Sequence, residues 1–270
     1  MSGERIIPQD FQSQHEYLIY LKEMFVYSWC ASVIRYDSVC LDLGCAEGFG
    51  TKELAGVLRK VVGIDIDKKS IERAASKYAG PSCSFMHYEA GRLPFSDCEF
   101  DAVVSLHVIE HISDAGHFLR DIERVLKPNG ILILTTPNRA LRLPKGGQPF
   151  NIHHVKEYDG FELKEALSDY FTGIDIMGLC ADEEVLRVEE KRIKQLNKIA
   201  SYDIFNLRRR LPAVILKPII TLIHFLRSRQ KGDFPDSLIE KIDGYGPGLF
   251  RIDNVYRSNS LDIIALCKKQ

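Results

Sequence analysis

Apolar and polar residues follow two periods along the chain. Seven short, nearly continuous apolar runs are typical of buried strands, and they lie at 38–44, 61–67, 83–90, 100–108, 130–138, 172–179 and 260–269. Between them, apolar residues recur at helical spacing at 51–60, 68–79, 114–130 and 158–171. Strands that are apolar throughout and alternate with helices indicate a parallel sheet covered on both faces. We therefore predict an α/β fold with a seven-stranded, mostly parallel sheet.

Two segments do not follow this alternation. Residues 13–35 carry aromatic and aliphatic residues at helical spacing without Gly or Pro, which predicts an N-terminal helical cap within 1–38. Residues 182–250 separate the sixth and seventh apolar runs, and we interpret them as a helical insertion. The predicted core is then 39–181, and 251–270 supplies the final strand that completes it.

Composition is that of a globular protein, with 45% hydrophobic and 27% charged residues and a formal net charge of -1. The charge is unevenly distributed, because 187–231 holds twelve Lys and Arg against three acids. The seven cysteines form no CxxC pair, and the first residues show no signal pattern. We therefore expect a reducing, cytoplasmic location. No apolar run reaches the length of about 20 residues that a membrane-spanning helix needs.

The first apolar run ends in a glycine-rich turn, "LGCAEGFG" at 43–50. Ligands of open parallel sheets lie beyond the carboxyl ends of the strands, so this turn predicts a ligand site. Ala46 and Phe49 break the G-x-G-x-x-G pattern of dinucleotide sites, and no P-loop sequence follows. Asp42 disfavours a pyrophosphate and suits a ligand ammonium group. The alternative is a turn that only joins a strand to a helix.

Two further features narrow the choice of ligand. Asp65 ends the second apolar run, 21 residues after Gly44, where a carboxylate can accept hydrogen bonds from a ribose diol. The sequence "EAGRLPF" follows the third run, so Glu89 can bond an exocyclic amine and the backbone at Ala90 a ring nitrogen. An ammonium site, a ribose acid and a purine-edge loop in this order indicate S-adenosylmethionine.

Residues 39–137 resemble class I S-adenosylmethionine-dependent methyltransferases of the type 11-like kind. The resemblance is carried by "LDLGCAEG", "GIDID", "EAGRLPF" and "FDAVVSLHVIEHISDAGHFLRDIERVLKPNGILILTTPN". Three positions depart from the family pattern: Ala46 replaces the middle glycine, Glu89 the usual Asp, and Asn129 a glycine. The resemblance implies a Rossmann-like fold, S-adenosyl-L-methionine as cofactor and methyl transfer as the activity.

The resemblance also implies roles by position. The cofactor-binding residues would be Asp42, Gly44, Cys45, Ala46, Gly48, Asp65, Ile66, Glu89, Ala90 and Leu106, from the methionine end to the adenine edge, with Leu106 beside the sulfonium. His107 would lie next to Leu106 and the methyl acceptor. The aromatic residues Tyr17, Tyr20 and Tyr27 of the first helix either cap the cofactor or pack in the core.

Histidines are the candidate catalytic residues, because imidazole titrates near neutral pH and a hydroxyl acceptor must lose its proton. We predict His107, His111 and His154 as candidate bases, with His153 as a further alternative. His107, Glu110 and His111 with a later histidine also resemble the metal site of some quinone and small-RNA end methyltransferases. Metal-free relatives carry the same Glu-His pair as a cap of the next helix, so we assign no metal ligands from the sequence.

The insertion carries "LRRRLPAVILKPIITLIHFLRSR" within 205–230, which is apolar nearly all round and has arginines at both ends. It is interpreted as a lid or homodimer element, or as a segment that contacts an anionic membrane surface peripherally. We do not expect nucleic acid as a partner, because the basic residues are not interleaved with aromatics. The predicted function is methyl transfer to a small-molecule, lipid-precursor or glycan acceptor. The alternatives are a non-catalytic cofactor-binding protein and a metal-assisted O-methyltransferase.

Overall fold

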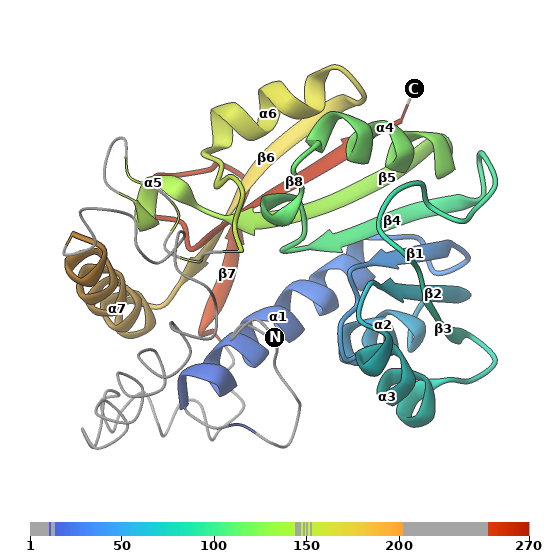
Figure 1. The fold of residues 1–270 in the computed structure, drawn as a ribbon, viewed down its shortest axis with the longest axis horizontal. Coiled ribbons are helices and arrows are strands. Elements are labelled where there is room, and N and C mark those ends of the chain that lie inside the picture. Colours follow the sequence, from blue (N-terminus) through green and yellow to red (C-terminus); the bar gives the residue numbers. More distant parts are fainter. Residues whose placement is uncertain are drawn as a thin grey trace.

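An eight-stranded sheet forms the centre of the computed structural model (Figure 1), which describes residues 11, 14–143, 147, 149, 151, 153–201 and 248–269. The strands are β1 (Val39–Leu43), β2 (Lys60–Asp65), β3 (Cys83–His87), β4 (Phe100–Leu106), β5 (Leu126–Pro137), β6 (Thr172–Ala181), β7 (Phe250–Asp253) and β8 (Asp262–Lys268). Their order is β3-β2-β1-β4-β5-β8-β6-β7. The predicted α/β class is confirmed.

Strands β1 to β5 pair in parallel, and β8 runs antiparallel between β5 and β6. The predicted number of seven strands is wrong by one among the described residues. The additional strand, β7, pairs antiparallel with β6 at the edge of the sheet. It carries Arg251 and Asp253 in four residues, so it lacks the continuous apolar run by which the other strands are recognised.

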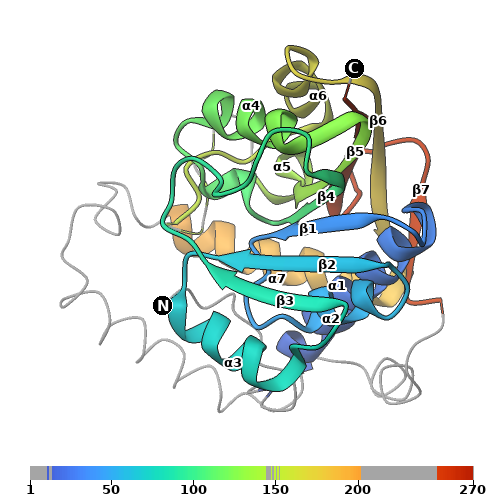
Figure 2. The ribbon, with the colours of Figure 1, turned by 90° about the vertical axis from the view of Figure 1, so that its right-hand side faces the viewer.

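Helices cover both faces of the sheet, as predicted (Figure 2). One face is packed by α1 (Gln14–Val33), α2 (Phe49–Ala55) and α7 (Glu183–Ser201), with α3 (Lys68–Tyr78) beside them. The opposite face is packed by α4 (Ala115–Val125) and α6 (Gly160–Ser168). A short 3-10 helix, η1 (Ile109–His111), follows β4, and α5 (Arg139–Arg142) follows β5.

Aspartates begin three of these helices by accepting hydrogen bonds from main-chain amides that would otherwise lack partners. Asp67 accepts from Ser70 N at the start of α3, and Asp114 accepts from His117 N at the start of α4. Asp159 forms a reciprocal capping box with Glu162 in α6. These local signals explain where each of the three helices starts.

The strand order reverses at β1, whose neighbours are β2 on one side and β4 on the other. The carboxyl ends of these strands bring the residues after Leu43, Asp65 and Leu106 to one edge of the sheet. This point of reversal is where open α/β sheets bind ligands. Asp262, the first residue of the antiparallel β8, lies at the same edge because it pairs with Pro137 and Leu179.

The predicted cap and insertion each correspond to a helix in the described part of the chain. Helix α1 lies within 1–38, and α7 lies within 182–250. The apolar and arginine-rich segment 205–230 lies outside the described residues, and the domain boundaries stay a prediction. Among the described residues, we find no helix with the length and apolar character that crossing a membrane requires.

Candidate functional site

The glycine turn after β1 has a left-handed backbone at three alternate residues, namely Gly44 (φ 86°), Ala46 (φ 45°) and Gly48 (φ 77°). The main-chain amides of Gly44 and Cys45 both donate to the carbonyl oxygen of Ile64, at 2.8 and 3.0 Å. Ala46 adopts a backbone conformation that favours glycine, the residue that the family pattern has at this position.

Packing within the protein explains the three glycines of this turn. A Cβ atom at Gly44 would overlap the side chain of Val108, and one at Gly48 would overlap the ring of Phe85. A Cβ atom at Gly50 would overlap the ring of Tyr27. The glycines alone are therefore no proof of a ligand. The overlap at Gly44 also shows that the turn lies directly against the segment that follows β4.

Asp65 holds the turn from the neighbouring strand. Its carboxylate accepts hydrogen bonds from Ala46 N at 3.0 Å and from Asp67 N at 2.8 Å, and the side chain is largely buried. The end of β2 and the glycine turn are thus joined through one carboxylate. This position agrees with the ribose contact that the sequence predicts, although that contact itself stays a prediction.

The surface next to Asp65 fits a nucleoside. Ile66 is a large aliphatic residue that is 58% exposed, although its neighbour Asp65 is buried. Glu89 and Ala90 are exposed in the turn after β3, the strand that pairs with β2. An exposed aliphatic side chain can lie against a flat base, and a carboxylate with exposed main chain can bond its edge. The residues present are compatible with the adenosine part of S-adenosylmethionine.

The structure revises the role of Asp42. Its side chain is 0% exposed, and its two oxygens accept hydrogen bonds from Tyr27 Oη at 3.2 Å and Thr51 Oγ1 at 2.6 Å. Burial raises the pKa of Asp42 to about 7, against the lowering effect of these two hydroxyls. Asp42 therefore connects Tyr27 of α1 with Thr51 of α2 through hydrogen bonds inside the protein. It does not present an exposed charge to a ligand ammonium group, as the sequence suggested.

The remaining predicted cofactor residues and tyrosines are divided between core and surface. Cys45 and Leu106 are buried, and Tyr27 packs in the core, so Tyr27 follows the core alternative. Tyr17 and Tyr20 are only partly buried and form an aromatic cluster with Phe11 and Phe49. This cluster joins the start of α1 to the start of α2, beside the glycine turn.

His107 follows β4 with a positive φ of 55°. Its Nδ1 lies 3.3 Å from Glu110 Oε1, and its Nε2 lies 3.3 Å from Asp262 Oδ2. Burial would lower the pKa of His107, but the charge of Asp262 and the hydrogen bonds to Asp262 and Glu110 raise it to about 10. His107 is therefore held as a cation at neutral pH, which disfavours its predicted role as a base, and the identity of the base stays a prediction.

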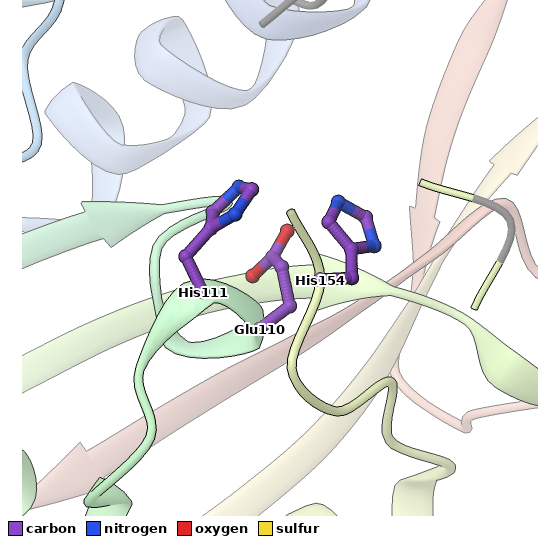
Figure 3. Close-up of side chains that lie close together, drawn as sticks. All are labelled: Glu110, His111 and His154. Atoms are coloured by element: carbon purple, nitrogen blue, oxygen red, sulfur yellow. The ribbon is translucent and has the colours of Figure 1, made fainter. Parts of the chain in front are cut away.

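The other two histidine candidates meet at the carboxyl edge of the sheet (Figure 3). One ligand atom each from Glu110, His111 and His154 lies within 4.8 Å of the others. The rings of His111 and His154 form an edge-to-face pair with centroids 4.8 Å apart. The side chain of the alternative candidate His153 is exposed, and its carbonyl oxygen accepts a hydrogen bond from His111.

Sequence reasoning did not identify three groups that define this site. Lys22 and Asp262 form an ion pair beside His107, and Glu157 lies 2.8 Å from His154. Two of them carry no local sequence signal. Lys22 is one charged residue in a long helix, and Asp262 begins an apolar run whose antiparallel direction the sequence does not reveal. The proximity of Glu157 to His154, three residues apart, was the one signal that could have been used.

Comparisons with known proteins agree with this geometry. Residues 41–134 match the family model described as a methyltransferase domain. A protein of Mycolicibacterium smegmatis named "Probable S-adenosylmethionine-dependent methyltransferase" is 34% identical over 167 residues, which are 62% of this chain and 63% of that protein. A ubiquinone biosynthesis O-methyltransferase of Caulobacter vibrioides is 36% identical over 105 residues, which cover 38% of this chain and 42% of the relative.

The fold is also found among solved structures. A S-adenosylmethionine-dependent methyltransferase of Thermotoga maritima has a TM-score of 0.56 and 13% sequence identity, with 95% of each chain covered. The aligned part of this chain spans less than two thirds of the Mycolicibacterium relative. The glycine turn, the strand order and these similarities lead to one assignment. Residues 41–134 therefore form a methyltransferase domain of the class I S-adenosylmethionine-dependent superfamily.

Proposed function

We propose that this protein transfers the methyl group of S-adenosyl-L-methionine to a hydroxyl oxygen of a small or lipid-linked molecule. The observation that carries the proposal is the arrangement of the glycine turn, Asp65 and the exposed Ile66 along one edge of the sheet. The methyltransferase domain matched at 41–134 contains all three.

In the proposed binding mode, the glycine turn approaches the methionine part of the cofactor and Asp65 bonds the ribose. Ile66 lies against the adenine, while Glu89 and Ala90 bond its edge. Methyl transfer is an in-line displacement at an activated carbon, so much of the rate comes from the relative position of acceptor and cofactor. The segment after β4 contributes to that position, because Val108 lies against Gly44.

An oxygen acceptor is favoured by two considerations. The Caulobacter relative carries the name of an O-methyltransferase, although it aligns with only 38% of this chain. A hydroxyl acceptor must also lose its proton to a nearby group. Glu110, His111 and His154 lie together at the carboxyl edge of the sheet, next to the glycine turn. Because His107 is already protonated, we assign this task to those three residues rather than to His107.

Binding of the cofactor product tests the first half of the proposal. Calorimetry with the full chain is expected to detect S-adenosylhomocysteine. Asp65→Asn is expected to weaken binding by about 10- to 100-fold, because a hydrogen bond to a charged group is worth roughly 1.5–3 kcal/mol. Asp169→Asn removes an exposed carboxylate at the turn after α6 and serves as the matched control. Preferential binding of NAD would contradict the proposal.

Transfer of tritium from the labelled cofactor to extracts of the source cells tests the second half. Label is expected in a small-molecule or lipid fraction and should be released by reagents that cleave methyl ethers. A chain that binds S-adenosylhomocysteine but labels nothing is instead a non-catalytic binding protein. Flotation with anionic liposomes, with and without 205–230, tests the peripheral membrane contact of that segment.

A further inference from the structure

We propose that Arg73 of α3 is a positioning residue for the cofactor, because it holds the glycine turn through the carboxylate of Glu47 and so sets the affinity for S-adenosyl-L-methionine. Glu47 lies in the middle of the turn, between the left-handed residues Ala46 and Gly48. The inference rests on the proposed function, in which this turn approaches the methionine part of the cofactor.

Helix α3 binds both oxygens of the Glu47 carboxylate. Arg73 Nε donates to Oε2 at 2.8 Å, and a terminal nitrogen of the same guanidinium donates to Oε1. Ser70 Oγ lies 2.8 Å from Oε1. A two-point contact between arginine and carboxylate fixes orientation as well as distance. One turn of α3 therefore determines where the middle of the glycine turn lies.

The same turn of α3 is also connected to Asp65. Ser70 Oγ lies 2.7 Å from Asp67 Oδ2, and Asp67 N donates to Asp65 Oδ1 at 2.8 Å. Asp65 Oδ2 accepts from Ala46 N at 3.0 Å, and Ala46 precedes Glu47 in the chain. These contacts form a closed ring from the glycine turn through α3 and the end of β2. The turn and Asp65 are thus positioned together.

Arg73 supplies the positive charge of this ring. Ser70 has one hydroxyl proton, and its Oγ lies between the carboxylates of Glu47 and Asp67. The guanidinium of Arg73 donates to the same Oγ at 3.1 Å and offsets the approach of the two acids. Glu47 is 5% exposed, so solvent screens this ion pair less than a pair at the surface.

The backbone of Ala46 gives the ring a specific task. Its φ of 45° is unfavourable for a residue with a Cβ atom, whereas glycine adopts such values readily. Strained backbone persists where the surrounding structure holds it. The amide of Ala46 is bound by Asp65, and the next residue, Glu47, is bound by Arg73. The ring therefore compensates for alanine in the turn.

Packing limits movement of the turn in the other direction. A Cβ atom at Gly48 would lie 2.7 Å from the Cβ atom of Ala74 in α3 and would overlap the ring of Phe85. The turn is thus in close contact with α3 and cannot move further towards it. The ion pair of Glu47 with Arg73 opposes movement away from α3.

Hydrogen exchange of the full chain without cofactor tests the ring separately from methyl transfer. Arg73→Gln is expected to raise exchange of the amides in 44–48 about 10-fold, because the turn opens more often once its charged hydrogen bonds are lost. Arg35→Gln is the matched control. It breaks a similar two-point contact with Asp37, before the opposite end of β1, and should leave exchange at 44–48 unchanged.

Calorimetry with S-adenosylhomocysteine measures the effect on cofactor affinity, at a temperature at which circular dichroism shows every variant to be folded. Arg73→Gln is expected to weaken binding about 10-fold, the lower end of what a hydrogen bond to a charged group contributes. Arg73→Lys keeps the charge without the two-point contact and should give an intermediate affinity. Glu47→Gln should match Arg73→Gln, and the double variant should lose no more, because both changes remove one interaction.

Ala46→Gly provides a readout that a merely structural ion pair would not change. Glycine needs no support in this conformation, so Arg73→Gln should weaken binding less than about 3-fold in the Ala46→Gly background. Equal losses in both backgrounds, additive losses from Glu47→Gln and Arg73→Gln, or unchanged exchange at 44–48 would overturn the inference. If exchange at 44–48 rises but the wild type does not bind S-adenosylhomocysteine, the proposed function fails and the hold of Arg73 on the turn stands.

Discussion

Lys22 Nζ lies 2.6 Å from Asp262 Oδ2, although the two residues are 240 positions apart in the sequence. Lys22 belongs to α1, and Asp262 is the first residue of β8. Both side chains are largely buried, and Asp262 also faces His107 at 3.3 Å. Lys22 and His107 overcome the effect of burial and hold the pKa of Asp262 well below its usual range. This buried ion pair therefore connects α1 to β8 next to His107.

Replacement of Lys22 should destabilise the protein without removing core packing. Lys22→Met keeps the aliphatic stem but leaves Asp262 with His107 as its remaining cation. We expect the free energy of unfolding to fall by about 1.5–3 kcal/mol, the usual worth of a hydrogen bond to a charged group. Lys164→Met, at an exposed position of α6, should change it by less than about 0.5 kcal/mol. Chemical denaturation measures both variants, and equal effects would contradict the role of the ion pair.

The charge of His107 predicts a pH dependence of stability. Its pKa is about 10 in the folded protein and about 6.5 in an unfolded chain. A raised pKa contributes stability that is fully present below pH 6.5 and is lost as the pH rises towards 10. The difference in free energy of unfolding between the wild type and His107→Gln should therefore be largest near pH 6 and shrink by pH 10. A difference that stays constant over this range would show that His107 is not held as a cation.

Most of the sheet could be predicted from the sequence because each inner strand is a continuous apolar run. The edge strand β7 escaped prediction, since the alternation of Phe250, Arg251, Ile252 and Asp253 is too short to separate from a loop. Its position depends on pairing with β6, about seventy residues earlier. Pairing over such a distance is not encoded in local periodicity.

The site was predictable where its residues follow one another along successive strands, as Gly44 and Asp65 do. The structure departs from the predicted surroundings of a residue where its partner comes from a distant element. Asp42 is occupied by Tyr27 of α1, and His107 is held as a cation by Asp262 of β8. Residue type and spacing alone favoured an exposed acid at Asp42 and a neutral base at His107. The burial of Asp42 and the charge of Asp262 beside His107 favour different roles.

Close packing of Tyr27 against the glycine turn predicts a sharp effect of one methyl group. Gly50→Ala would place a Cβ atom inside the ring of Tyr27, whose hydroxyl bonds Asp42. We expect a loss of about 1–3 kcal/mol in stability from overpacking, with weaker binding of S-adenosylhomocysteine. Gly80→Ala is the control, because nothing lies within 4 Å of its Cβ position. Thermal unfolding and calorimetry distinguish them, and an unaffected Gly50→Ala would refute this account of the turn.

Asn138, the residue after β5, is buried and connects this strand to the segment 256–260 through hydrogen bonds of its side-chain amide. Its Nδ2 donates to the carbonyl oxygens of Ser258 at 3.0 Å and Ser260 at 2.8 Å, and its Oδ1 accepts from Tyr256 Oη at 2.9 Å. Asn138→Asp keeps the shape, but its carboxylate can only accept and would face these carbonyl oxygens.

Because Asn138 is 0% exposed, water cannot compensate for the lost donors. We expect Asn138→Asp to lower the free energy of unfolding by about 2–4 kcal/mol, as removal of a partner leaves buried polar groups unsatisfied. Asn197→Asp, which alters one hydrogen bond from α7 to the carbonyl of Arg142, should cost less than half as much. Urea denaturation at pH 7 measures both. If Asn138→Asp were as stable as Asn197→Asp, the segment 256–260 could not depend on Asn138 for its attachment to β5.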